Sequence, residues 1–266
     1  MPARPFYRYR RPAIAVALSS APSPEPSPVR QFLRVLCHVA LPIAIVGTSQ
    51  IAPAEAQILG SISVESDARF RGYSLGSGDP AATLDLGYDH ESGLYLNGSA
   101  TVGVDQSDPA LLTYQLNAGY AARISPTVSI DAGAVRSWYT RHSSGAGDTH
   151  YTELYLGVTA HGISSHVYYS PDYLRPGIET LYAEVESTIN LAPEWRLTGH
   201  AGLLTHLSDP PRYARREHYD WRATLGRDLG KLELHASLSG AGPGSDYYSG
   251  RRHSATAVTF GASLPF

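Results

Sequence analysis

Charged side chains recur at every second position in several stretches of the 266-residue sequence. In residues 65–71, Glu, Asp, Arg and Arg alternate with other residues, and the same spacing returns later in the chain. On an extended strand, residues two apart point to the same side. Rings of charged side chains filter small solutes in channels, so this pattern favours the wall of a polar pore. The residues expected to line such a lumen are Glu65, Asp67, Arg69, Arg71, Asp85, Asp131, Glu153, Glu184, Glu186, Arg196, His200, Asp220, Arg222, Glu233 and His235.

A catalytic or metal site is harder to find in the same residues. Ser165 and His166 are adjacent, but on a strand they would point to opposite faces, and no recognisable nucleophile motif surrounds them. The histidines lack a close pair beside a carboxylate, so we expect no metal site and no cofactor. An outer-membrane lipid or ester hydrolase is kept as a low-ranking alternative. The serine, histidine and acidic residues it would draw on are His161, Ser164, Ser165, His166, Glu217, His218 and Asp220.

Strands with one apolar side must position these charges. Apolar residues occupy alternate positions in about twelve segments between residues 57 and 266, which predicts half-exposed β-strands. The first strand is expected to run from residue 58 to 71, with Ala68 and Phe70 on its apolar side. Beyond His161 and Gly162 the apolar positions change from even to odd numbers, as an odd-length turn would permit.

The connections between these segments alternate in length. Short turns are expected near residues 90–93, 123–126, 161–162, 192–194 and 228–230, with longer polar loops between them. Short turns at one end and long loops at the other are the layout of a transmembrane up-and-down antiparallel β-barrel. We therefore predict an all-β barrel of twelve strands, with ten or fourteen as alternatives, and both termini on the periplasmic side.

Aromatic residues near the expected strand ends favour a membrane barrel over a soluble sandwich. Residues 57–266 contain one lysine, Lys231, where a soluble sheet would carry many at its surface and edges. Phe266 ends an alternating strand and is interpreted as a signal for outer-membrane assembly. Aromatic side chains at two levels form interfacial girdles in such barrels. The expected girdle residues are Tyr73, Tyr88, Tyr95, Tyr120, Trp138, Tyr139, Tyr173, Trp195, Tyr219 and Trp221.

The N-terminal part of the chain has the pattern of an export signal and not of a folded domain. Residues 1–28 are rich in Arg and Pro and are expected to be disordered or to precede the true start. Residues 29–56 have the order of a secretory signal peptide, with cleavage expected after Ala56. Residues 1–56 hold six of the 21 basic and two of the 24 acidic residues, so residues 57–266 carry a formal charge of −7. This acidic balance argues against a nucleic-acid partner. The mean hydropathy of −0.19 excludes a bundle of membrane helices.

Several short motifs also resemble a known family. The segments 66–74 (SDARFRGYS), 88–95 (YDHESGLY), 151–157 (YTELYLG) and 168–173 (YYSPDY) are similar to those of Gcw_chp, a proteobacterial family of outer-membrane proteins of unknown function. The resemblance covers most of residues 58–266 and implies an outer-membrane barrel. Ala68 departs from it, because an aromatic residue is expected there. The family supplies no catalytic residues to carry over.

We therefore expect residues 57–266 to form a narrow, passive, porin-like channel for small polar solutes in a Gram-negative outer membrane. The first alternative is a closed structural or adhesive barrel, because twelve strands lie between side-chain-filled small barrels and open porins. The expected partners are outer-membrane lipids and lipopolysaccharide, together with the barrel-assembly machinery, which would read the C-terminal strand. Basic clusters in two long loops are interpreted first as solvated loop surface and, as the alternative, as contacts to lipopolysaccharide phosphates: Arg212, Arg215, Arg216, Arg251 and Arg252.

Overall fold

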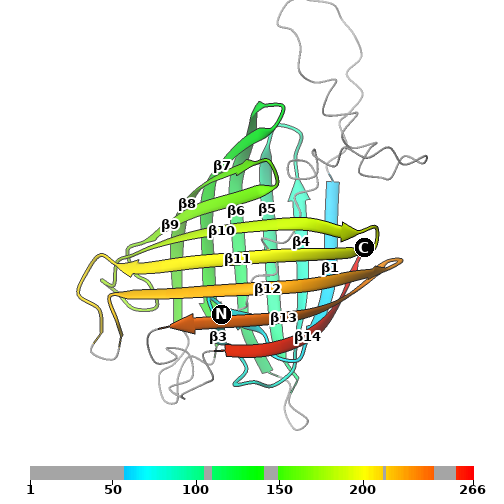
Figure 1. Cartoon of the computed structure of the whole chain (residues 1–266). Coiled ribbons are helices and arrows are strands. Elements are labelled where there is room, and N and C mark those ends of the chain that lie inside the picture. The colour runs from blue at the N-terminus through cyan, green and yellow to red at the C-terminus, as the bar shows by residue number, and fades with distance from the viewer. Residues whose placement is uncertain (1–56, 105–109, 141–148, 212–213, 243–255) are drawn as a thin grey trace, which may run out of the picture.

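The protein is a closed twelve-stranded antiparallel barrel (Figure 1). The structure, a computed structural model, describes residues 57–104, 110–140, 149–211, 214–242 and 256–266. The expected leader, residues 1–56 with its cleavage after Ala56, lies outside the described residues. The barrel strands are β1 (Gln57–Glu65), β4 (Ala81–Asp89), β5 (Leu94–Gly103), β6 (Ala110–Ser125), β7 (Val128–Tyr139), β8 (Thr149–Ala160), β9 (Ile163–Ser170), β10 (Thr180–Ala192), β11 (Trp195–His206), β12 (Glu217–Leu229), β13 (Leu232–Gly242) and β14 (Thr256–Pro265).

The first and last strands close the barrel. β1 pairs antiparallel with β14, from Ser61 opposite Pro265 to Glu65 opposite Gly261. Beyond this ladder, Gly60 and Phe266 exchange two backbone hydrogen bonds of 3.1 and 2.9 Å. Closure leaves no unpaired edge in the sheet, which a barrel needs in order to sit in a membrane. The predicted twelve strands and the antiparallel up-and-down order are confirmed.

Tight turns join the strands at one end of the barrel. Between β8 and β9, His161 and Gly162 both have positive φ angles, 50° and 80°, as a type I′ turn requires. Ala160 then pairs with Ile163, so the apolar positions change from even to odd numbers. The turn has two residues, so the expectation of an odd-length turn is wrong, although the change of parity is confirmed.

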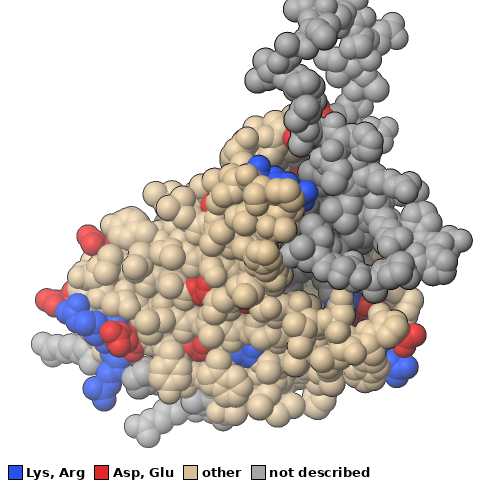
Figure 2. Space-filling view, turned by 45° about the horizontal axis from the view of Figure 1, so that its top comes forward, with Lys and Arg blue, Asp and Glu red and all other residues tan. Residues whose placement is uncertain are grey.

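The two faces of the barrel differ sharply in chemistry. On β1, Ile62 and Val64 are half exposed on the outer face, whereas Ser63 between them is 5% exposed. The outer face of the other strands is likewise formed by exposed Leu, Ile and Val side chains, and the inner face by buried Ser, Thr and charged groups. Figure 2 shows charged side chains gathered mostly toward the ends of the visible wall. This is the alternation expected of a barrel that faces lipid outside and a polar lumen inside.

A small hairpin folds inside this wall. β1 ends at Glu65, and residues 69–74 form a separate two-stranded sheet of β2 (Arg69–Phe70) and β3 (Tyr73–Ser74). Its tip residues, Arg71 and Gly72, both have positive φ angles, 45° and 79°, which matches a type I′ turn. The prediction of one strand from residue 58 to 71 is therefore wrong.

The side chain of Asp67 stabilises the break between β1 and the hairpin. It accepts hydrogen bonds from the Ser74 hydroxyl at 2.6 Å and from the Arg69 guanidinium at 2.8 Å. Ala68 and Phe70, expected on the apolar outer side, are 2% and 4% exposed because they pack inside the barrel.

The described residues contain no helix that is long and apolar enough to cross a membrane.

Candidate functional site

The hairpin is anchored to the opposite wall by an ion pair. The Arg71 guanidinium lies 2.8 Å from the Glu153 carboxylate on β8, and their side chains are 3% and 0% exposed. The same guanidinium lies 3.8 Å from the ring centre of Tyr182 on β10, a cation–π contact. Burial alone would lower the pKa of Arg71, but Glu153 and the neighbouring tyrosines together outweigh burial and hold that pKa well above its ordinary value. Arg71 therefore carries a fixed positive charge, and its side chain joins the hairpin to β8.

A second contact holds the hairpin against β12. The rings of Tyr73 and His218 stack with centroids 4.5 Å apart, and the Tyr73 hydroxyl lies 2.9 Å from Nδ1 of His218. Nε2 of His218 lies 3.2 Å from the Arg71 carbonyl oxygen, which can only accept a hydrogen bond. His218 therefore donates from Nε2, and in the neutral imidazole Nδ1 accepts from the Tyr73 hydroxyl.

Gly72 lets the tip of the hairpin approach the wall closely. A Cβ atom at this position would lie 2.2 Å from the Cβ of Ala241 on β13 and 3.2 Å from the Gly240 carbonyl oxygen. The positive φ angle of Gly72 also disfavours any other residue. The hairpin therefore packs in direct contact with β13 on one side and reaches β8 on the other.

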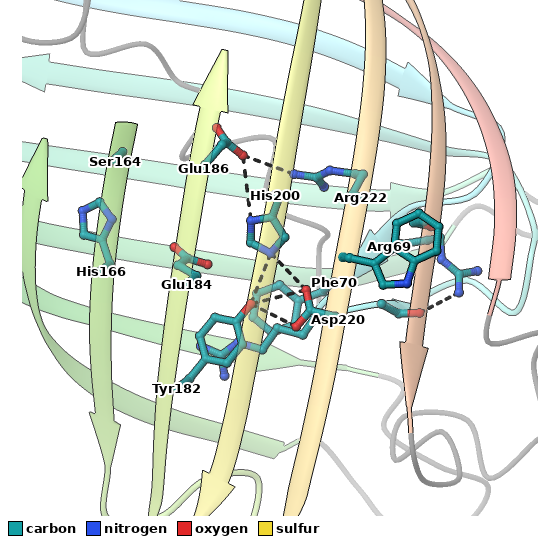
Figure 3. Close-up of a pocket in the computed structure, with 14 residues that line it drawn as sticks. Arg69, Phe70, Ser164, His166, Tyr182, Glu184, Glu186, His200, Asp220 and Arg222 are labelled. Atoms are coloured by element: carbon teal, nitrogen blue, oxygen red, sulfur yellow. Dashed lines mark hydrogen bonds and ion pairs between the residues drawn. The ribbon is translucent and has the colours of Figure 1, made fainter. Parts of the chain in front are cut away.

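Beside the hairpin lies a group of ionisable side chains from β10, β11 and β12, which we call the acid–histidine cluster: Glu186, His200, Asp220 and Arg222 (Figure 3). His200 Nε2 lies 3.0 Å from Asp220, and Nδ1 lies 4.0 Å from Glu186. Arg222 lies 3.6 Å from the same Glu186 oxygen. Tyr182 donates a hydrogen bond of 3.1 Å to Asp220. Strand register explains the grouping, because Glu186 is opposite His200 and His200 is opposite Arg222.

Further ionisable side chains lie between this cluster and the short-turn end of the barrel. Near the β12–β13 turn, Arg196 pairs with both Asp228 and Glu233, whose side chains are 36% and 31% exposed. Exposure falls to 17% at Glu186 and to 3% at Asp220, which lies beside the hairpin. A recess lies beside the cluster, lined by residues of the hairpin and of β9 to β13. The ionisable side chains are thus more deeply buried toward the hairpin.

Tyrosines fill the lumen between β5 and β10. Tyr155, Tyr168 and Tyr182 face one another across adjacent strands, with ring centroids 5.4 and 6.1 Å apart. The hydroxyls of Tyr95 and Tyr155 share a short hydrogen bond, and Tyr155 also donates to Asn117 at 2.8 Å. Their side chains are 5% exposed or less. This tyrosine row fills the lumen beside the acid–histidine cluster, which it contacts through the hydrogen bond from Tyr182 to Asp220.

Glycines make room for these rings. A Cβ atom at Gly119 would lie 2.4 Å from the Tyr95 hydroxyl, and one at Gly133 would lie 2.5 Å from the Tyr155 hydroxyl. Both glycines lie in the middle of strands, β6 and β7, where glycine lacks a side chain to pack. Here the absent side chains leave the space that the tyrosines occupy.

Carboxylates outnumber guanidinium groups on the described inner surface. Each of Arg69, Arg71, Arg196 and Arg222 has at least one carboxylate neighbour. Further carboxylates are held by hydroxyl groups or histidines instead: Glu184 by Tyr168 at 3.0 Å, Asp85 by Ser61 at 3.0 Å, Asp131 by His166 at 3.3 Å and Glu65 by His235 at 3.5 Å. With neutral histidines the described lumen carries net negative charge.

The structure places all of the sequence-predicted lumen residues inside the barrel. Twelve belong to wall strands: Glu65, Asp85, Asp131, Glu153, Glu184, Glu186, Arg196, His200, Asp220, Arg222, Glu233 and His235. Asp67, Arg69 and Arg71 reach the lumen from the hairpin segment and not from the wall. The charges do not form one ring, because they fall into separate groups along the lumen.

The girdle prediction needs a correction for four residues. Tyr73, Tyr95, Tyr139 and Tyr173 are 2–8% exposed and lie inside the barrel, so they are not girdle residues. Tyr95 and Tyr139 occupy inward positions of β5 and β7, whereas Tyr73 and Tyr173 belong to the hairpin and to the β9–β10 loop. The other six lie on the outer face, exposed or, for Trp138, half-buried: Tyr88, Tyr120, Trp138, Trp195, Tyr219 and Trp221.

The residues considered for hydrolysis are placed in different environments. Ser164 accepts a hydrogen bond of 3.1 Å from Thr159, while His166 faces Asp131 on β7. His218 is engaged by the hairpin through Tyr73 and the Arg71 carbonyl. Within the described ranges, no group of three or more His, Cys, Asp or Glu side chains is arranged to hold a metal ion.

Sequence reasoning missed the roles of four lumen residues. Tyr155, Tyr168 and Tyr182 were not among the predicted site residues, although each occupies a polar, inward position of its strand. A tyrosine on the charged side of a strand was the sequence signal that could have placed these rings in the lumen. His218 could not be found in this way, because its role depends on a hairpin that alternation did not predict.

Solved structures with the same fold are outer-membrane proteins. The chain superposes on the NanC porin with a TM-score of 0.52 at 10% identity, covering 79% of this chain and 99% of that one. The KdgM porin gives 0.46 at 11% identity, covering 79% and 99%. An outer-membrane channel from Pseudomonas putida F1 gives 0.47 at 12%, covering 84% and 98%. No curated protein sequence matches the chain.

The family comparison agrees with the motifs noted in the sequence. The profile of the family described as "Bacterial protein of unknown function (Gcw_chp)" matches residues 50–258, which is most of the chain. The match includes the hairpin, the acid–histidine cluster and the tyrosine row. The chain therefore belongs to the bacterial Gcw_chp family and has the fold of a porin-like barrel.

Proposed function

We propose that this protein is a narrow outer-membrane channel that passes small polar solutes and prefers cations. The observation that carries the proposal is the series of ionisable inner side chains that runs from the partly exposed Asp228 and Glu233 near the short turns to the nearly buried Asp220 beside the hairpin. Its wall is polar and acidic, whereas the outside of the barrel is apolar. Charged linings of one sign attract ions of the opposite sign and repel others.

The proposal includes the location and orientation of the barrel. The exposed apolar outer face supports a membrane location, because soluble proteins rarely expose such large patches. Residues 29–56 would direct export across the inner membrane, as their signal-peptide pattern predicts. The short turns and both ends of the barrel would then face the periplasm, with the longer connections outside.

In the proposed channel the hairpin determines the width of the open lumen. It crosses the lumen between β13 and β8, where Gly72 contacts one wall and Arg71 pairs with the other. Beside it the tyrosine row leaves little free space. We therefore expect a small unitary conductance and exclusion of bulky solutes.

The same packing favours one second candidate, a closed barrel with a structural or adhesive role. Glu153 and Thr101 are 0% exposed on the inner face, as expected where a lumen is filled by side chains. In that case the hairpin would be a permanent part of the core. The two candidates differ in whether solutes cross the refolded protein.

Uptake of labelled amino acids into proteoliposomes tests the channel and its charge preference together. Lysine and glutamate are similar in size and opposite in charge. We expect lysine to enter faster than glutamate, and both to enter faster than into liposomes without protein. Uptake no faster than in empty liposomes would favour the closed barrel, and faster entry of glutamate would contradict the cation preference.

A further inference from the structure

An arginine on the outer face of the barrel lacks a carboxylate partner among the described residues. Arg136 lies on β7 at an outward position, since it pairs with Leu116 on one side and Thr152 on the other. Leu116 is 52% exposed and marks the apolar outer wall. The guanidinium donates one hydrogen bond of 3.2 Å to the Thr152 hydroxyl. Its charge is therefore balanced by no acidic group of the described chain.

A stacked pair of aromatic rings lies beside this arginine. Its guanidinium carbon lies 5.2 Å from the ring centre of Trp138, and Trp138 stacks on Tyr114 with centroids 4.7 Å apart and an interplanar angle of 12°. Trp138 in turn pairs with His150, an exposed residue next to the start of β8. We call Tyr114, Arg136, Trp138 and Thr152 the outer-rim cluster.

The position of the outer-rim cluster fits the headgroup level of a bilayer. It lies near the end of β7 that leads to the long connection, whereas the exposed apolar side chains Leu154 and Leu156 lie further along β8 toward the short turn. Trp and Tyr side chains concentrate at membrane interfaces. An arginine on the lipid face costs about 2–4 kcal/mol at the bilayer midplane but about 0–1 near the interface.

A second arginine provides an internal comparison. Arg227 on β12 also points outward and lies 5.2 Å from a tryptophan ring, that of Trp195. Arg227, however, lies 3.5 Å from the Glu194 carboxylate at the short-turn end of the barrel. The two sites share the arginine–tryptophan geometry, but only at Arg136 is the acidic partner missing from the described protein.

We propose that the outer-rim cluster binds a phosphate group of lipid A in the outer leaflet. A guanidinium has five N–H donors in a planar fork. Arg136 donates one of them to Thr152, so further donors are available to phosphate oxygens. Because Thr152 accepts from Arg136, its own hydroxyl proton is available to the same anion. The stacked rings of Tyr114 and Trp138 supply the amphipathic surface beside the headgroup.

This site differs from the loop arginines considered as lipopolysaccharide contacts, because it lies on the barrel wall. The inference rests on the proposed outer-membrane location and orientation but not on solute passage. A failure of the lipid site and a failure of the channel are therefore separable, since a silent channel would leave lipid binding unchanged.

Native mass spectrometry of the refolded full chain in detergent tests the site. The protein is mixed with lipid A, with enzymatically dephosphorylated lipid A, or with phosphatidylglycerol. We expect retention of lipid A by the wild-type protein and about tenfold weaker retention by Arg136→Gln, because a charge-assisted hydrogen bond contributes at least that factor. The matched control Arg227→Gln should retain lipid A as the wild type does.

Several outcomes would overturn the proposal. Equal retention by Arg136→Gln and the wild type, or an equal loss in Arg227→Gln, would exclude a specific role for the outer-rim cluster. Equal retention of dephosphorylated lipid A would show that phosphate is not recognised, and equal retention of phosphatidylglycerol would refute lipid A as the ligand. Thr152→Val, a nearly isosteric change, provides a milder second variant that should weaken retention in the same direction if Arg136→Gln does not refold.

Discussion

Removal of the Arg71 side chain should release the hairpin from the lumen. In Arg71→Ala the buried Glu153 carboxylate loses its 2.8 Å ion pair, and Tyr182 loses the guanidinium that covers it. Breaking a buried pair by removing one partner costs about 3–5 kcal/mol. Such a change lowers the ratio of docked to undocked hairpin by about two to four orders of magnitude.

Single-channel recording in planar bilayers measures the consequence directly. We expect Arg71→Ala to show larger current steps, or a larger fraction of open time, than the wild-type protein at the same voltage and salt. Arg227→Ala is the control, because its pair with Glu194 has side-chain exposures of 47% and 60%. Exposed pairs contribute about 0–1 kcal/mol, so the control should conduct as the wild type does.

A double variant separates docking from loss of charge. Arg71→Met with Glu153→Gln removes both charges and leaves side chains of similar size, so no buried carboxylate is left without a cation at this contact. Its hairpin should dock better than that of Arg71→Ala. The reasoning would be refuted if Arg71→Ala conducted like the wild type, or if the double variant conducted at least as strongly as the single one.

Three further predictions concern the hairpin, the recess and the wall. Gly72→Ala should raise conductance in the same assay, because the added methyl group would meet β13 at 2.2 Å and the φ angle is +79°; an unchanged current would contradict this. Glu186→Gln should move the reversal potential in a salt gradient toward zero, since it removes a lumen charge, and no movement would count against the recess as the filter. Leu156→Arg should reduce the free energy of folding into lipid vesicles by about 2–4 kcal/mol, and Leu94→Arg, at the first residue of β5, by about 0–1; equal losses would argue against the proposed depth of these side chains.

The wall of the barrel could be predicted from the sequence because alternation is a local property. Each strand shows its two faces in its own residues, and the closed order follows from many such strands joined by turns of alternating length. Leu154 and Leu156, for example, are exposed on β8, while Glu153 and Tyr155 are buried. No long-range contact was needed to infer that division.

The hairpin could not be predicted in the same way. Alternation continues without a break from Glu65 to Arg71, and a wall strand and a folded-back hairpin satisfy it equally. The difference lies in Asp67, which bonds Ser74 seven residues later, and in Arg71, whose partner Glu153 is 82 residues away. Such contacts are invisible to a pattern with a period of two.

The girdle prediction used the position of each aromatic residue along its strand, but the face to which the side chain points also has to be considered. Tyr95 lies near a strand end, as a girdle residue should, but it lies between the outward Leu94 and Leu96 and so must point inward. The same reasoning places Tyr139 inside, next to the outward Trp138. Tyr73 and Tyr173 belong to segments outside the barrel strands, where strand alternation carries no information.

The proposed channel is tested most directly by recording currents through the refolded full chain in a planar bilayer under a salt gradient. We expect small discrete steps for the wild-type protein, with a reversal potential that indicates cation preference, and larger or more frequent steps for Arg71→Ala. An absence of steps in both proteins at all voltages and salt concentrations, or a preference for anions, would contradict it.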